Sequence, residues 1–371
     1  MSAGDYGIMA IALVSSFSLV WVVFYQVTLL SGAFGFLLCW YFSFLAMYWL
    51  VTSKLTEPQL ATDRVVTVVM TTGAAIIIGL VLFIIVYVAA KAIPNIHWIP
   101  LLTKTQKGFT PAESNALQHF GIAHAIVGTF EQVGVAAVIG LPVAVATAVF
   151  LNEVGGRGTR IVRTVVTAMS GIPSIVAGLF IYSILIIEHV LSYSGFAASL
   201  ALFVMLLPSV TRTTEEVLRV VPSGLREASM ALGAPEWRTT WSVVLPTARS
   251  GVVTAALLGV ARIVGETAPL LFTAFGSQIM NTNVFSHPQE ALPLLVWTNV
   301  RQAEPLLITL AYQAAFVLLI IVLVLFVAAR IVGRTKRKKG ARRLPQLRPR
   351  KSPVLSTDPT ILAVLGESSE N

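Results

Sequence analysis

The segment "PSGLREASMALGAPEWRTTWSVVLP", residues 222–246, is the most informative part of this sequence. Its residues predict two short helices: Ser223 is a suitable N-cap for the first, and Gly233 can adopt the left-handed conformation that ends it. Pro235 suits the first turn of the second helix, and Pro246 then limits that helix. Spacing alone leaves two interpretations open: a bent element that fits a groove of another protein, or an ordinary amphipathic connector.

The regions on both sides of this segment are apolar and long enough to cross a membrane. The chain of 371 residues is 56% hydrophobic and 12% charged, whereas a soluble domain carries about 25% charged residues. We therefore expect an all-α, polytopic helical membrane protein with about eight transmembrane helices, each needing about 20 apolar residues. The expected crossings are residues 7–30, 35–52, 65–90, 125–151, 162–187, 194–211, 249–275 and 305–329.

The basic residues predict the orientation of these crossings. Eleven Lys and Arg and no acidic residue lie at 330–351, and further arginines lie at 157–163 and 212–249. All three groups fall on one side of an eight-crossing path, so both termini are expected to be cytoplasmic. The excess charge belongs to the tail at 336–371, which we expect to be disordered. It predicts a cytoplasmic anchor with contact to anionic membrane lipid, and no nucleic-acid binding.

Several kinds of chemistry have no support in this sequence. The single cysteine, Cys39, and five scattered histidines form no metal-ligand spacing. There is no G-x-x-x-x-G-K-[ST] phosphate-binding loop. We therefore predict no metal site, no cofactor and no enzymatic activity in this chain, so that any ATP hydrolysis belongs to a separate subunit.

The run "RIVGETAP", residues 262–269, places two charges near the centre of an expected crossing. Arg262 and Glu266 are four residues apart, which predicts that they share one helix face. Two interpretations are open: a purely structural salt bridge between helices, or part of an anion route. Gly265 and Pro269 either loosen the helix for gating or are breakers tolerated within a bundle, and we favour the second.

The chemistry of these side chains suits phosphate. The planar guanidinium of arginine donates paired hydrogen bonds to two oxygens, and Arg212 offers a second positive point that Glu216 can tune. Phosphate keeps a proton near neutral pH and sulfate does not, so a carboxylate at Glu266 favours phosphate and weakens its binding enough for release. On this hypothesis Glu266→Gln alters phosphate flux without loss of assembly, whereas loss of assembly indicates a structural bridge.

Residues 222–246 resemble the EAA motif of ABC-importer permeases, E-A-A-x3-G-x9-I-x-L-P. Two positions depart from it, Ser229 and Val243, and both substitutions are small or apolar. The resemblance favours the first interpretation of this segment, because in that family it is the docking loop for a cytoplasmic ATPase. The docking residues implied are Glu227, Ala228, Gly233, Leu245 and Pro246.

A narrower resemblance rests on "MLLPSVTRTTEE" (205–216), "LLGVARIVGETAPLLFTAFG" (257–276) and "SGIPSIVAGLF" (170–180). These runs resemble the PstA-type permease subunits of phosphate ABC importers. In that family, residues matching Arg212, Arg262 and Glu266 are associated with phosphate passage. The resemblance covers about residues 64–335 and implies a six-helix permease core there. Residues 1–52 are then an extra two-helix hairpin.

The same resemblance implies partners and a location. They are a PstC-type permease subunit, a dimer of PstB-type ATPases that binds ATP and Mg, and a PstS-type phosphate-binding protein, assembled at the inner membrane for ATP-driven phosphate import. Three alternatives remain: a permease for another oxyanion such as sulfate or molybdate, an ATP-independent secondary transporter or channel, and a regulatory subunit that reports phosphate status. The RTTEE and GETAPLLFTA runs disfavour the first, and the docking segment disfavours the second.

Overall fold

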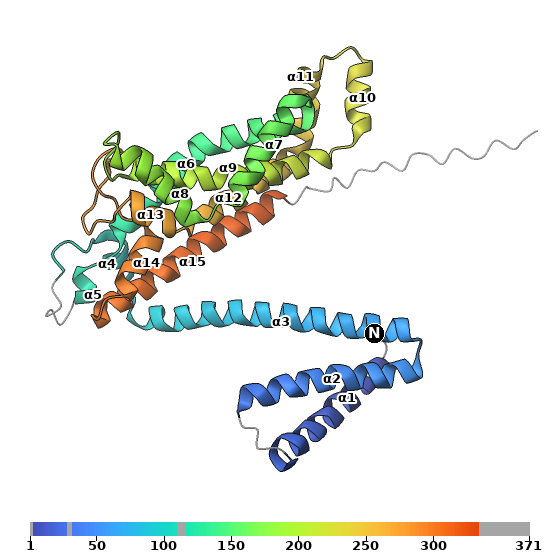
Figure 1. The fold of residues 1–371 in the computed structure, drawn as a ribbon. Helices are drawn as coiled ribbons and strands as arrows, with labels where there is room; N and C mark the ends of the chain where they lie inside the picture. The colour runs from blue at the N-terminus through green and yellow to red at the C-terminus, as the bar shows by residue number, and fades with distance from the viewer. Residues whose placement is uncertain (1–2, 28–31, 110–115, 334–371) are drawn as a thin grey trace, which may run out of the picture.

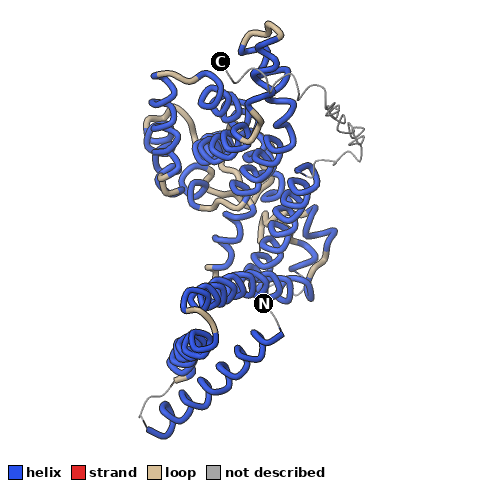
Figure 2. Tube along the Cα trace, turned by 90° about the vertical axis from the view of Figure 1, so that its right-hand side faces the viewer, coloured by secondary structure: helices blue, strands red, loops and turns tan. Residues whose placement is uncertain are grey.

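The computed structural model describes residues 3–27, 32–109 and 116–333, and its elements are helices (Figures 1 and 2). The expected tail at 336–371 lies outside these residues. The long helices are α1 (Ala3–Val22), α2 (Ala33–Leu55), α3 (Pro58–Ala92), α6 (Ala123–Val149), α7 (Arg157–Ser170), α9 (Gly195–Arg219), α12 (Leu245–Val264) and α15 (Pro305–Gly333). The shorter helices are α4 (Trp98–Thr103), α5 (Ala116–His119), α8 (Ser174–Ile181), α10 (Ser223–Ala231), α11 (Glu236–Thr239), α13 (Ala268–Thr273) and α14 (Leu292–Val300). Short 3-10 or π-helical segments are η1 (Val23–Val27), η2 (Ile93–Asn95), η3 (Phe150–Val154), η4 (Tyr182–Ile187) and η5 (Thr240–Val244).

Helices α6 and α9 run parallel and form the centre of the bundle. At one end, Gln132 of α6 and Phe196 of α9 both hydrogen-bond to the loop at residues 274–291. At the other end, Ala148 and Leu218 pack in one buried cluster. Because the two helices point the same way, the chain between them must travel back across the bundle.

Helices α7 and α8 make that return as one broken crossing. Arg163 of α7 contacts Glu215 near the end of α9, and α8 continues toward the opposite end. The pair is bent by 105°, so the prediction of one continuous helix at 162–187 is wrong. The physical cause lies at the break: Pro173 has no N–H to donate and disfavours helical geometry in the residue before it. The described residues hold seven continuous helices of membrane length, and counting the bent pair as one crossing gives eight.

The end of the docking segment also differs from the prediction. Helix α11 runs through η5 directly into α12, giving a 29-residue span from Glu236 to Val264. Pro246 therefore does not limit a short helix. The π-helical turn η5 comes just before Pro246 and accommodates its ring and its missing N–H.

The first two helices form an antiparallel pair that reaches the rest of the molecule through α3. The ring of Phe17 in α1 meets the rings of Phe36 and Trp40 in α2 edge-on, each at 5.5 Å. Helix α3 in turn packs along α15, where Gln313 donates to the carbonyl of Asn95 at 2.9 Å. Figure 2 shows the α1–α2 pair extending away from the other helices. The expected division at residues 1–52 and 64–335 stays a prediction.

Polar side chains of α6 and of the loop at 274–291, here called the polar knot, form hydrogen bonds at the end of the bundle where α6 begins. Gln289 accepts from Gln132 at 3.1 Å and donates to Glu131. The neighbouring Glu290 is buried, and burial raises the pKa of its carboxyl to about 8 although two backbone N–H groups donate to it. The backbone here lies so close to α6 that a Cβ on Gly128 would be 2.0 Å from the carbonyl oxygen of Glu290.

We predict that Gly128→Ala destabilises the protein by about 1–3 kcal/mol, because the added methyl group must push the loop at 289–291 away from α6. Gly134→Ala is the matched control on the same helix, since a Cβ there meets nothing within 4 Å. The measurement is the thermal unfolding midpoint of each purified variant in detergent. Equal midpoints for the two variants would contradict the close packing described here.

Candidate functional site

A pocket of about 320 Å³ lies where the break between α7 and α8 meets α9 and α12. The broken helix pair contributes its lining at the bend, α9 contributes one face that includes Pro208, and α12 contributes its last turn. The lining residues are Met169, Ser170, Ile172, Met205, Pro208, Ser209, Arg212, Thr213 and Arg262. Residues from three distant parts of the sequence therefore share one cavity.

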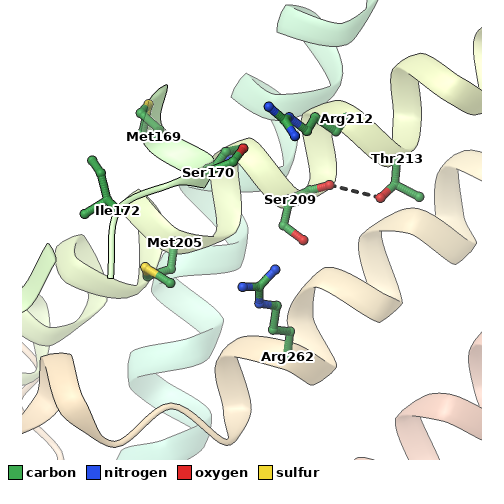
Figure 3. Close-up of a pocket in the computed structure, with 9 residues that line it drawn as sticks. Met169, Ser170, Ile172, Met205, Ser209, Arg212, Thr213 and Arg262 are labelled. Atoms are coloured by element: carbon green, nitrogen blue, oxygen red, sulfur yellow. Dashed lines mark hydrogen bonds between the residues drawn. The ribbon is translucent and has the colours of Figure 1, made fainter. Parts of the chain in front are cut away.

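Two arginines give this pocket its charge. Figure 3 shows the Arg212 and Arg262 side chains on opposite sides of Ser209. In the part of the chain that the structure describes, neither guanidinium group has a hydrogen-bond or ion-pair partner. Two unneutralised cations around one cavity attract an anion, and their paired N–H donors match the oxygens of a tetrahedral oxyanion.

The third residue of the predicted set, Glu266, is placed differently. Helix α12 ends at Val264, and Glu266 lies in the break before α13, so Arg262 and Glu266 do not share a helix face. The prediction of an i, i+4 pair is therefore wrong. Among the described residues the two form no ion pair, and Glu266 is absent from the pocket lining.

The cause of this break is the pair of breakers that flank Glu266. Pro269 has no N–H to donate to the carbonyl of Gly265, and glycine readily leaves helical geometry. The two residues therefore interrupt the helix between Val264 and Ala268, and whether this break serves gating or is only tolerated within the bundle stays a prediction. The backbone of Pro269 packs tightly on α8, where a Cβ on Gly178 would lie 2.6 Å from its Cα.

The docking segment projects from the end of the bundle opposite the polar knot, as the α10 and α11 labels show in Figure 1. The bend between the two helices depends on Gly233, whose φ of 83° favours glycine. Ser229 binds the hydroxyl of Thr239 at 2.8 Å and so joins α10 to α11. The predicted N-cap is wrong: Pro222 precedes the helix without a side-chain cap, and Ser223 is the first residue of α10.

The five predicted docking residues are not equivalent in their surroundings. Glu227, Ala228, Gly233 and Pro246 are exposed, whereas Leu245 is half-buried against the cluster that contains Leu218. Exposed apolar side chains accompany the first group: Leu232 is 90% exposed, Trp237 68% and Trp241 69%. The apolar side chain of Leu232, at the bend and outside the crossings, suits contact with another protein, whereas Trp237 and Trp241 lie in the first part of the span that ends at Val264.

Arg226 fixes α10 to the bundle, and the sequence reasoning missed it. Its guanidinium donates to both carboxylate oxygens of Glu153, at 2.9 and 3.2 Å, and to the carbonyls of Leu218 and Val221. This one side chain joins the docking segment to the ends of α6 and α9. No local pattern indicates the Glu153 contact, because the two residues are 73 positions apart.

A second ion-pair group lies beside it on α7 and α9. Glu215 accepts from Arg163 at 2.7 Å and from Arg219 at 2.6 Å. The sequence analysis named the neighbouring Glu216 as a residue that can tune Arg212; Glu216 is exposed and, among the described residues, forms no ion pair with Arg212. The i, i+4 spacing of Glu215 and Arg219 is the local signal for the ion pair that the sequence analysis missed. Within the described residues, no group of three His, Cys, Asp or Glu side chains is arranged to hold a metal ion.

The chain resembles known proteins over the region that contains these sites. Residues 139–338 match the family described as "Binding-protein-dependent transport system inner membrane component". The chain is 42% identical over 226 residues to "Phosphate transport system permease protein PstA 1" of Mycobacterium tuberculosis (strain ATCC 25618 / H37Rv), covering 61% of this chain and 73% of that protein. It is 38% identical over 252 residues to "Phosphate transport system permease protein PstA" of Haemophilus influenzae (strain ATCC 51907 / DSM 11121 / KW20 / Rd), covering 64% and 85%.

A solved structure of the MetNI methionine ABC transporter in inward-facing conformations is also similar. It is 25% identical, covers 57% of this chain and 92% of that chain, and gives a TM-score of 0.43. The family match includes Arg212, Arg262 and the docking segment and begins after α1, α2 and α3.

We predict that Glu153→Gln lowers stability by about 1–3 kcal/mol, because it leaves the partly buried guanidinium of Arg226 without a charged acceptor. The expected result is a lower thermal unfolding midpoint in detergent. Glu216→Gln is the control, since this glutamate is exposed and has no partner among the described residues. If both substitutions leave the midpoint unchanged, Arg226 does not anchor α10 through Glu153.

Proposed function

The chain belongs to the family of binding-protein-dependent transport system inner membrane components, and on this basis we propose that it is the permease subunit of an ATP-driven ABC importer for inorganic phosphate. It is a multi-pass protein of the inner membrane. The observation that carries the substrate assignment is the pocket in which Arg212 and Arg262 meet without a counter-charge from the described residues. The names of the relatives point to the same anion.

The pocket suits transient passage of phosphate. Each guanidinium group can donate two hydrogen bonds to the anion while keeping its own charge. Both arginines are exposed, so that water screens their attraction and the anion can leave again. A path that bound phosphate in a fully buried cage would hold it too tightly for transport.

Glu266 keeps its proposed role as a selectivity residue, although it lies beyond the pocket lining. It follows Arg262 at the helix break, where the backbone is free of regular helical bonds. A carboxylate at this point accepts a hydrogen bond from the P–O–H group of hydrogen phosphate and repels sulfate, which has no such donor. Competition by sulfate in a Glu266→Gln variant therefore tests this role separately from the two arginines.

The docking segment supports the proposed partners. Its exposed face around Leu232 and Gly233 fits a groove on a cytoplasmic PstB-type ATPase, which supplies ATP and Mg to the complex. We further propose a PstC-type permease as the second membrane subunit and a PstS-type protein that delivers phosphate from outside. We also propose that both termini lie in the cytoplasm with the docking segment, which requires the bent pair α7–α8 to count as one crossing beside the seven continuous helices.

We predict that Arg262→Ala reduces ATP-dependent phosphate uptake about tenfold or more, because it removes a charge-assisted donor from the pocket. Uptake is measured with radiolabelled phosphate in proteoliposomes that hold the full complex, with sulfate as competitor. Arg249→Ala is the matched control: Arg249 is exposed on the same helix and lies outside the pocket lining.

Three results would contradict the assignment. Unchanged uptake in Arg262→Ala, with the ATPase still co-purifying, would mean that the anion passes elsewhere. Transport of sulfate in place of phosphate by the native complex would transfer the assignment to another oxyanion permease. Uptake that needs no ATP would indicate a secondary transporter.

We predict that Leu232→Asp abolishes or strongly weakens co-purification of the ATPase, because it places a charge on the most exposed apolar side chain of the docking segment. Val190→Asp is the control, since Val190 is also an exposed apolar residue but lies in the loop between η4 and α9. Retention of the ATPase by the Leu232 variant would show that this surface is not the docking contact.

A further inference from the structure

Helix α7 has a polar face, of which Ser170 alone lines the pocket of Arg212 and Arg262. Its hydroxyl and guanidinium side chains recur every three or four residues, which places them on one side of the helix. The opposite side presents Ile161 and Val165, which are 68% and 52% exposed. The residues of the polar face are Thr159, Arg160, Arg163, Thr164, Thr167 and Ser170.

A pocket of about 560 Å³ follows this polar face. Apart from Gly156, which precedes the helix, its lining residues all belong to α7 and its polar side: Thr159, Arg160, Arg163, Thr164 and Thr167. Ser170, one turn beyond Thr167 on the same face, lines the pocket of Arg212 and Arg262 instead. The two pockets therefore lie along one polar face of one helix.

The charge on this face is not neutralised. Arg163 is held by Glu215, which also binds Arg219, so that these three side chains keep one net positive charge. Arg160 is exposed, and across the described residues its guanidinium has no hydrogen-bond or ion-pair partner. Thr167 lies two turns away on the same side, and its hydroxyl has no hydrogen-bond partner among the described residues.

The direction of α7 places Arg160 between the Arg212–Arg262 pocket and the docking end of the bundle. The helix begins at the end of the bundle where Arg163 meets Glu215 and where α10 projects, and it ends at the pocket with Ser170. Arg160 lies ten residues before Ser170, about 15 Å along the axis. An anion that leaves the first pocket toward the docking end therefore meets Arg160 after one helix length of polar side chains.

We propose that the polar face of α7 is the exit segment of the anion path, with Arg160 as a second anion-binding point between the Arg212–Arg262 pocket and the docking end of the bundle. This inference rests on the proposed function, because it assumes that the first pocket carries an oxyanion. The hydroxyl groups along α7 make the path hydrophilic, and the charge of Arg160 creates a positive potential that attracts the anion from the first pocket toward the docking end.

The first test measures the potential along this face without any transport. In the full complex, Thr167→Cys is introduced into a chain that carries Cys39→Ser, since Cys39 is its single cysteine. The cysteine is then modified with an anionic and a cationic methanethiosulfonate reagent, with and without Arg160→Gln. We expect the anionic-to-cationic rate ratio to fall about two- to tenfold in the Arg160 variant, given a separation of about 10 Å.

A matched position shows whether this change is local. Thr247→Cys is exposed on α12, away from both pockets, and its ratio should not respond to Arg160→Gln. An unchanged ratio at Thr167, or a cysteine there that neither reagent reaches, overturns the exit segment even if the complex imports phosphate. If the ratio falls but the complex transports no phosphate, the proposal of an anion path along α7 stands and the assignment of phosphate as the substrate fails.

The second test measures transport through the same complex. Arg160→Ala should lower phosphate uptake about three- to tenfold with the ATPase still bound, and Arg160→Lys should restore most of it because the charge returns. Ile161→Ala, on the apolar side of α7, serves as the control for damage to the helix. Equal uptake in the native complex and Arg160→Ala overturns the role of this residue, as does a failure of lysine to rescue.

Discussion

The cost of taking a guanidinium group out of water is the constraint on which this structure depends. Arg212 and Arg262 both lie within helices of membrane length, and neither is neutralised by a described residue. Such side chains persist in a membrane protein where they line a water-filled cavity. The break between α7 and α8 and the end of α12 supply that cavity, and irregular backbone within a membrane protein is tolerated where it lines a cavity or is buried in protein.

The same breaks explain how the site is held in shape. Helix α8 packs on α13 so closely that Gly178 leaves no room for a side chain against Pro269. Helices α8 and α13 thus support each other beside the pocket, while α9 contributes Arg212 to its lining. A change in the angle between these short helices would move the lining of the pocket, and it would need no new contact at the arginines themselves.

The contacts of Arg226 suggest how the docking segment can act on that pocket. Its guanidinium joins α10 to Glu153 after α6 and to the last turn of α9, the helix that carries Arg212. Helix α11 continues without interruption into α12, the helix that carries Arg262. A partner that moves α10 and α11 therefore pulls on both pocket arginines through rigid elements, whereas α1 and α2 reach the rest of the molecule through α3.

The sequence by itself determined the helical membrane class, the bend at Gly233 and the two arginines of the pocket, since apolar length, a glycine between two short helices and isolated charges are local signals. The expected eight crossings are reached only when the bent pair α7–α8 is counted as one crossing beside the seven continuous helices of membrane length among the described residues. The sequence did not determine the partners of the charged residues. Four-residue spacing predicted a pair of Arg262 with Glu266, but the helix ends between them. Only the tertiary structure placed Arg212 and Arg262 in one pocket and Glu153 in contact with Arg226, because these arrangements depend on how separate helices pack and where each one breaks.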